Sequence, residues 1–276
     1  MLPARPSLTA RRTATYRAQH QRVDPVRVLD DPLAIPLLGD DALEPLDQAG
    51  PPERAGARLY VAARARFAED VLAAAVAEGT RRYVVLGAGL DTFGLRNPYP
   101  ELEVIEVDHP STQAWKRARI ERAGLPVPER LRWLPVDFEV DDLAARLQTV
   151  GVGPGRPALF GWLGVTYYLG ADAIRSTLRA VAACGPGAAL VLDFRYPEET
   201  MQGAARSRSL AVSERVRSVG EPFVSHFTLE SLRALLEAAG LVVAESHDVG
   251  TLWTRYLGAE RRTGVGIMGV VHARVA

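Results

Sequence analysis

The hydrophobic and polar positions divide the chain into two parts with different periodicity. In the first 80 residues, apolar positions recur at helical spacing in 13–23 and 53–78, and no strand pattern is evident. The second segment begins beside two prolines and ends just before Gly79, which are typical helix boundaries. We therefore predict a helical lead over residues 1–80 that caps the ligand-binding edge of a sheet.

From residue 82 onward, short apolar runs alternate with amphipathic segments, which is typical of a parallel sheet with helices on both faces. The last strand is expected to follow its neighbour through a loop rather than a helix, so it could run antiparallel. The expected strands are 82–86, 102–107, 131–136, 157–163, 187–193, 241–247 and 265–274. The expected helices are 90–96, 111–123, 139–148, 171–183, 201–219 and 228–239. The pattern predicts an α/β fold in which 81–276 form the sheet domain, with a lid at about 195–227, and the whole chain forms one compact unit.

Composition narrows the classes of function. The chain of 276 residues carries 33 basic and 33 acidic side chains, so its formal net charge is zero. Nucleic acid and an anionic membrane are therefore disfavoured as partners. No window approaches the ~20 apolar residues of a membrane span, and no signal-peptide core is evident. The single cysteine, Cys184, and the lack of clustered histidines disfavour a metal site. We expect a soluble cytoplasmic protein without a metal, and the sequence does not indicate its oligomeric state.

A glycine turn between the first two expected strands is the strongest candidate for ligand binding. Gly87 and Gly89 follow the first strand, and Asp108 ends the second. Two glycines let the backbone approach a ligand closely, and a carboxylate can accept both hydroxyl hydrogens of a ribose. The dinucleotide fingerprint would require a further glycine where this chain has Thr92. A nucleoside-type cofactor, a nicotinamide cofactor and a plain turn remain alternatives on these residues.

Polar and aromatic residues also follow the other expected strands at the same edge. His109 comes directly after Asp108, Asp137 and Phe138 follow the third strand, and 163–168 follow the fourth. Each could be a simple strand cap or a packing residue. Together, however, they suit an adenosine, because a carboxylate can accept from the exocyclic amine and a ring can stack on the base. The edge therefore favours an adenosine with an uncharged substituent, and S-adenosylmethionine is the common cofactor of that kind.

Several segments spread over nearly the whole chain form a recognisable set. They are RAQHQ (17–21), DDPLA (30–34), YVAARARFAEDVL (60–72), VVLGAGLDT (84–92), EVDHP (106–110), PVDF (135–138), ALFGWLGVTYYL (158–169) and HFTLESLRALLEAAGL (226–241). They resemble the leucine carboxyl methyltransferase family of class I S-adenosylmethionine-dependent methyltransferases, and most closely its actinobacterial branch. The resemblance implies a Rossmann-like, mostly parallel seven-stranded sheet with an α-helical N-terminal cap.

The resemblance also implies roles for individual residues. Arg64 matches an arginine that pairs with the methionine carboxylate of the cofactor. Gly87 corresponds to the backbone approach to the methionine part, and Asp108 to the ribose ligand. Asp137 and Phe138 correspond to the adenine site.

One position departs from the family pattern. Many members carry a glutamate where this chain has Leu163, and that acid helps to hold the amino group of the cofactor. A backbone carbonyl within 161–164 could take its role, and the resemblance includes a Trp-Leu-Gly-Val form in the actinobacterial branch. A protein that binds the cofactor without catalysis is the alternative that Leu163 suggests.

Candidates for the chemical step depend on the methyl acceptor. A carboxylate acceptor is already ionised, whereas a hydroxyl would benefit from a general base. His226 is the favoured base, followed by His20, and the resemblance puts Tyr168 near the substrate. Tyr167 is a further substrate-side candidate, and Arg195 could hold a substrate carboxylate.

The sequence as a whole predicts an S-adenosylmethionine-dependent O-methyltransferase. Its acceptor would be a carboxylate or hydroxyl of a small molecule, such as a polyketide of secondary metabolism. The alternatives are a protein C-terminal carboxyl methyltransferase, as in the eukaryotic members, a non-catalytic cofactor-binding protein, and an NAD-dependent oxidoreductase.

Overall fold

A seven-stranded sheet forms the centre of the protein in a computed structural model that describes residues 7–258 and 266–276. Its strands are β1 (Arg82–Leu86), β2 (Glu103–Asp108), β3 (Leu131–Pro135), β4 (Leu159–Trp162), β5 (Ala189–Arg195), β6 (Leu241–Asp248) and β7 (Met268–Val275). The spatial order is β3-β2-β1-β4-β5-β7-β6. Neighbouring strands from β3 to β5 pair in parallel, and β7 is antiparallel to both β5 and β6. The predicted mostly parallel α/β sheet is therefore confirmed, including its antiparallel last strand.

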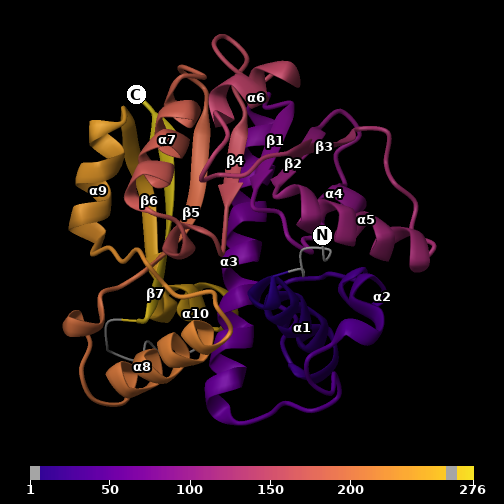
Figure 1. Cartoon of the computed structure of the whole chain (residues 1–276), viewed down its shortest axis with the longest axis vertical. Coiled ribbons are helices and arrows are strands. Elements are labelled where there is room, and N and C mark those ends of the chain that lie inside the picture. Colours follow the sequence, from indigo (N-terminus) through magenta and orange to yellow (C-terminus); the bar gives the residue numbers. More distant parts are fainter. Residues whose placement is uncertain (1–6, 259–265) are drawn as a thin grey trace.

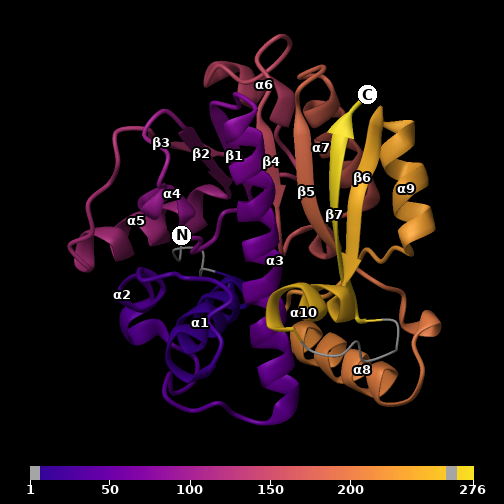
Figure 2. The same ribbon diagram turned by 180° about the vertical axis from the view of Figure 1, so that it is seen from behind.

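Helices cover both faces of this sheet. They are α1 (Leu8–Val23), α2 (Ala34–Leu38), α3 (Pro52–Ala77), α4 (Phe93–Arg96), α5 (Pro110–Arg122), α6 (Leu143–Thr149), α7 (Ala171–Ala182), α8 (Gly203–Ser218), α9 (Leu229–Ala238) and α10 (Val249–Leu257). Successive side chains of a strand point to opposite faces, so Tyr83 and Val85 of β1 pack in one hydrophobic cluster with α3. Val84 and Leu86 pack in the other cluster with α6, α7 and α9. The same division is visible in Figure 1 and, from behind, in Figure 2.

The N-terminal helices lie next to the edge at which the parallel strands end. Helix α1 packs against α2 and α3, and α3 contacts β4 and β5. In Figure 1, α1 and α8 lie beyond the carboxyl ends of β4 and β5, at the lower end of the view. A ligand at this edge would therefore be covered by helices that come from distant parts of the chain.

Most expected elements are present with ends shifted by a few residues, and the larger differences lie at three helices. Helix α10 lies between β6 and β7, where a loop was expected, and the Asp248 side chain caps it by accepting from the Thr251 backbone N–H at 2.7 Å. Helix α6 begins four residues later than expected because Asp142 is its N-cap. Helix α1 begins five residues earlier, where Ser7 caps it. The expected start of the last strand at 265 lies outside the described residues.

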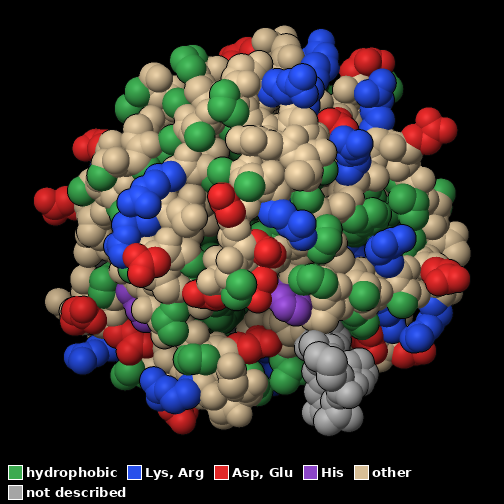
Figure 3. Space-filling model, turned by 45° about the horizontal axis from the view of Figure 1, so that its top comes forward, with side chains coloured by type: hydrophobic (Ala, Val, Ile, Leu, Met, Phe, Trp, Pro, Cys, Tyr) green, Lys and Arg blue, Asp and Glu red, His purple; other side chains and the backbone are tan. Residues whose placement is uncertain are grey.

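The outer surface carries mixed charge. On the face shown in Figure 3, acidic and basic side chains are interspersed. None of the described helices combines the length and the apolar composition that crossing a bilayer requires.

Candidate functional site

A cavity of about 490 Å³ opens at the carboxyl edge of the sheet. It is bounded by the ends of β1, β2, β3 and β4, by α1 and α3, and by the loop 220–224. All eight residues expected at the cofactor line it: Arg64, Gly87, Gly89, Asp108, His109, Asp137, Phe138 and Leu163. The structure therefore brings together side chains that lie up to 99 positions apart in the sequence.

The glycine turn has a backbone conformation that other residues rarely adopt. The φ angles of Gly87 and Gly89 are 68° and 51°, in the left-handed region. A Cβ atom added to Gly87 would overlap the Cγ2 atom of Val165. The backbone N–H groups of Gly87 and Ala88 both donate to the carbonyl of Val107, which closes the turn against β2. Glycine is thus required at position 87 for both conformation and space.

We expect Gly87→Ala to destabilise the fold and to disturb the cavity. The left-handed conformation alone costs about 1–2 kcal/mol for a residue with a Cβ atom, and the displaced Val165 adds to that cost. Gly79→Ala is the matched control, because Gly79 also has positive φ (105°) but a Cβ atom there would meet nothing within 4 Å. Urea unfolding of both variants measures the difference. Equal losses of stability would show that Val165 does not constrain the turn.

Asp108 retains capacity for a ligand although it is already hydrogen-bonded. Its Oδ2 accepts from the Gly89 backbone N–H at 2.5 Å, and its Oδ1 accepts from the His109 N–H at 2.7 Å. Burial raises the pKa of Asp108, while these two donors lower it. A carboxylate offers about four acceptor positions, so about two remain for hydroxyl groups such as those of a ribose.

The residues that were predicted to contact an adenine lie together on one rim of the cavity. His109 is the N-cap of α5, and its Nδ1 lies 2.7 Å from Ser111 Oγ. Its Nε2 lies 3.9 Å from Asp137 Oδ2. The other oxygen of Asp137 accepts from the Glu139 backbone N–H at 3.0 Å, and the half-buried Phe138 lines the cavity beside it. This rim offers a carboxylate and an aromatic ring to a flat polar ligand.

Arg64 occupies the opposite part of the cavity and is held by an acid that the sequence reasoning missed. Its side chain forms an ion pair with Asp193, which is fully buried and lies two residues before the end of β5. Asp193 also accepts from the Gly164 backbone N–H at 2.7 Å, and Arg64 donates to the Tyr167 hydroxyl at 3.2 Å. Burial opposes the charge of Arg64, but Asp193 outweighs it and the pKa of Arg64 is raised. Asp193 could have been found from its position, since it ends a predicted strand at the ligand edge as Asp108 does.

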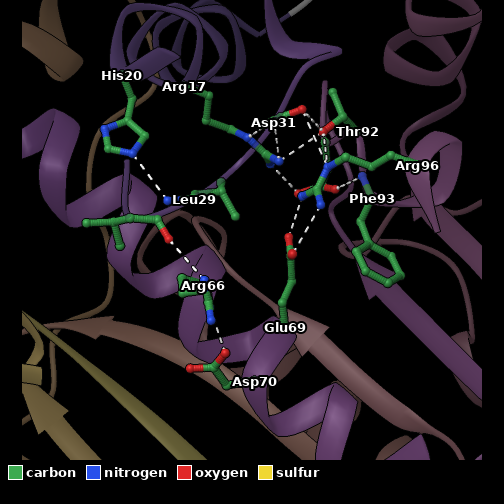
Figure 4. Close-up of polar contacts among 12 residues, drawn as sticks. Arg17, His20, Leu29, Asp31, Arg66, Glu69, Asp70, Thr92, Phe93 and Arg96 are labelled. Atoms are coloured by element: carbon green, nitrogen blue, oxygen red, sulfur yellow. Dashed lines mark hydrogen bonds and ion pairs between the residues drawn. The ribbon is translucent and has the colours of Figure 1, made fainter. Parts of the chain in front are cut away.

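A buried polar network joins the N-terminal helices to the glycine turn (Figure 4). Arg17 of α1 donates to Asp31 at 2.9 Å and to Thr92 Oγ1 at 3.0 Å, and it forms an ion pair with Asp91. Thr92 in turn donates to Asp31 at 2.6 Å. Although burial opposes the charge of Asp91, Arg17 holds the pKa of its carboxyl below the usual value. The acid beside the glycine turn is therefore neutralised by the helical lead.

Comparison with known proteins agrees with these features. The family model described as "Leucine carboxyl methyltransferase" matches residues 10–182, which is more than half of the chain. The chain belongs to the leucine carboxyl methyltransferase family.

Relatives and one solved structure extend this assignment. YktD of Bacillus subtilis, provisionally named as an S-adenosyl-L-methionine-dependent methyltransferase, is 36% identical over 189 residues, covering 66% of this chain and 61% of that protein. A similarly named protein of Mycolicibacterium gilvum is 32% identical over 75% of this chain and 72% of its own length. The match spans less than two thirds of YktD and of a further relative in Saccharopolyspora erythraea. A DUF574 family protein of Streptomyces avermitilis has the same fold, with a TM-score of 0.63, 16% identity, and coverage of 94% of this chain and 100% of that one.

The part of the cavity nearest to helix α1, which we name the α1 end, carries no histidine among the described residues. It is lined by Ser7, Thr9, Ala10, Thr13, Tyr168, Gly220, Glu221, Pro222 and Val224. Burial raises the pKa of Tyr168. Burial also raises the pKa of Tyr167, to about 12. Both tyrosines thus stay protonated near neutral pH and can act as hydrogen-bond donors rather than as bases.

His20, which was expected on the substrate side, does not line the cavity. It is buried in α1, with Nδ1 at 2.7 Å from Asp24 Oδ2, and its Nε2 accepts from the Leu29 backbone N–H at 3.2 Å. Both ring nitrogens are therefore used within the helical lead. Leu163 does line the cavity, but its side chain packs against the hydrophobic cluster around α3 and offers no acceptor.

His226 and Arg195 also lie outside the cavity lining, contrary to the expectation for a base and a carboxylate clamp. The Nε2 of His226 is buried without a partner in the described part of the chain. Burial, and then the charge of Arg195, lowers the pKa of His226. Arg195 donates to Ser209 Oγ at 2.5 Å and Ser213 Oγ at 3.2 Å, and its guanidinium lies 4.4 Å from the ring centre of Phe223. The Arg195 side chain thus fastens α8 to β5.

Proposed function

We propose that this family member transfers the methyl group of S-adenosylmethionine to an oxygen atom of a small molecule. The observation that carries the proposal is Asp108, which has unused acceptor positions beside the left-handed Gly87–Gly89 turn. A ribose with two hydroxyl groups fits those positions. Membership of the methyltransferase family supports the same cofactor.

The cavity residues would bind this cofactor at three points. Arg64 would hold the methionine carboxylate, and Asp137 with Phe138 would hold the adenine. Gly87 lines the cavity without a side chain, which supports a close backbone approach by the ligand. When bound, S-adenosylmethionine supplies a methyl group that passes to the acceptor oxygen while the carbon–sulfur bond breaks with its electrons on sulfur, and an acceptor proton passes to water. The chain itself would align the acceptor at the α1 end.

Thermal unfolding with ligands tests the cofactor assignment. We expect S-adenosylmethionine and S-adenosylhomocysteine to raise the melting temperature and NAD to leave it unchanged. A ligand at a hundred times its dissociation constant stabilises the folded state by about 2.7 kcal/mol, which is easily measured. A shift with NAD alone would favour the oxidoreductase alternative. A cooperative transition that none of the three shifts would refute the assignment of the cavity.

The acceptor can be identified by the release of S-adenosylhomocysteine in a screen of small hydroxyl compounds, small carboxylic acids and peptides with a free C-terminus. We expect turnover with small molecules and none with the peptides. Turnover confined to the peptides would favour the protein carboxyl methyltransferase alternative.

A further inference from the structure

Three groups with full or partial positive charge face the cavity, and each is already bound by a carboxylate of the chain itself. Arg17 is paired with Asp31 and Asp91, and Arg64 is paired with Asp193. These are the only arginine or lysine side chains among the described lining residues. The third group is the amino end of α1, whose first backbone N–H groups have no acceptor within the helix and carry partial positive charge.

The partner of the α1 helix end is Glu221, which comes from the loop after α8. Its two carboxylate oxygens accept from the Leu8 and Thr9 backbone N–H groups, both at 3.0 Å, and from Ser7 Oγ at 3.2 Å. Glu221 and Thr9 both line the cavity. The internal carboxylate thus occupies the N–H groups that a substrate carboxylate would otherwise bind.

We propose that Glu221 determines acceptor specificity by admitting uncharged hydroxyl acceptors to the α1 end and excluding carboxylates. This inference rests on the proposed methyl transfer to oxygen. The carboxylate of Glu221 repels an incoming anion, and a substrate carboxylate would lose its water shell without gaining a free cation or N–H group. The other described residues at the α1 end present hydroxyl groups and apolar surface, which suit a neutral hydroxyl compound with an apolar body.

The same carboxylate has a second consequence that can be measured without any acceptor. S-adenosylmethionine carries a positive sulfonium, whereas S-adenosylhomocysteine has a neutral sulfur at the same place. Because Glu221 lines the cavity at the acceptor end, its carboxylate should stabilise the sulfonium form selectively. Glu221→Gln keeps one oxygen acceptor for the α1 end and replaces the other oxygen by an NH2 group, which removes the negative charge at nearly unchanged shape. Glu214→Gln is the matched control, because Glu214 is 71% exposed on α8 and pairs with Arg217 away from the cavity.

Isothermal titration of the full chain with both cofactor forms is the first experiment. We expect Glu221→Gln to weaken the binding of S-adenosylmethionine by about threefold relative to the binding of S-adenosylhomocysteine. Glu214→Gln should keep the wild-type ratio. An unchanged ratio in Glu221→Gln would overturn the inference while leaving the proposed function intact. Failure of the wild-type chain to bind S-adenosylhomocysteine would instead refute the proposed function.

Matched acceptor probes complete the test. 2-Naphthol and 2-naphthoate have similar shape and differ in charge, and each can be titrated into the S-adenosylhomocysteine complex. We expect the wild-type chain to bind the naphthol at least tenfold more tightly, and Glu221→Gln to narrow this gap by about threefold because naphthoate gains affinity. Naphthoate binding as tightly as naphthol to the wild-type chain would overturn the proposal.

Discussion

Asp193→Ala is expected to lower the free energy of unfolding by about 3–5 kcal/mol, because it leaves a buried cation without its partner. Arg64 is 5% exposed and Asp193 is fully buried, so water cannot replace the lost carboxylate. The backbone N–H of Gly164 loses its acceptor in the same change. The ion pair also ties α3 to β5 across 129 positions of sequence, so the effect should spread to the packing of the helical lead.

A double replacement separates this explanation from a simple loss of packing. Arg64→Met together with Asp193→Ala removes both charges. The double variant should therefore lose less stability than the sum of the two single variants, and also less than Asp193→Ala alone. Asp172→Ala serves as the control, since Asp172 is 99% exposed and its removal should change stability by less than about 0.5 kcal/mol. Urea unfolding without ligand provides all four values. Additive losses in the double variant would contradict a role for the unpaired charge.

The sheet could be predicted because its signals are local. Apolar runs and the breaks between them predicted β1 with its observed bounds. They also identified Asp108 as an acid that ends a buried strand. Parallel strands end at one edge, so residues after four different strands could be expected in one site without knowledge of their contacts. The cavity lining agrees with that expectation for Gly87, Asp108 and Asp137.

The missed features depend on pairings between distant segments. Glu221 binds the start of α1 across 212 positions, and no local pattern indicates that a loop acid will cap a helix in another part of the chain. Arg195 was expected at the ligand edge because it follows a strand, yet it turns toward α8 and binds Ser209. His20 could have been recognised as structural, because Asp24 lies four residues later on the same helical face. The sequence can therefore indicate a contact between residues spaced along one helix, but it does not indicate a contact between distant segments.

Asp108→Ala is expected to weaken the binding of S-adenosylhomocysteine by about tenfold to a hundredfold. Hydrogen bonds to a charged group contribute about 1.5–3 kcal/mol, and Asp108 has free acceptor positions for the ribose hydroxyl groups. The variant also frees the Gly89 N–H, so the fold must be checked by its unliganded unfolding curve. Calorimetric titration of a variant that still unfolds cooperatively then measures the affinity.

A cofactor analogue without the 2′-hydroxyl group shows whether Asp108 acts on the ribose. The wild-type chain should bind 2′-deoxy-S-adenosylhomocysteine more weakly than the parent compound, whereas Asp108→Ala should bind the two almost equally. Because burial raises the pKa of Asp108, the unliganded carboxyl takes up its proton at a higher pH than an exposed aspartate does. The wild-type preference for the hydroxylated compound should therefore decline as the pH is lowered through that raised pKa, and the Asp108→Ala variant should show no such decline. An undiminished preference in the variant would assign the ribose to another residue and remove the main support for the proposed cofactor site.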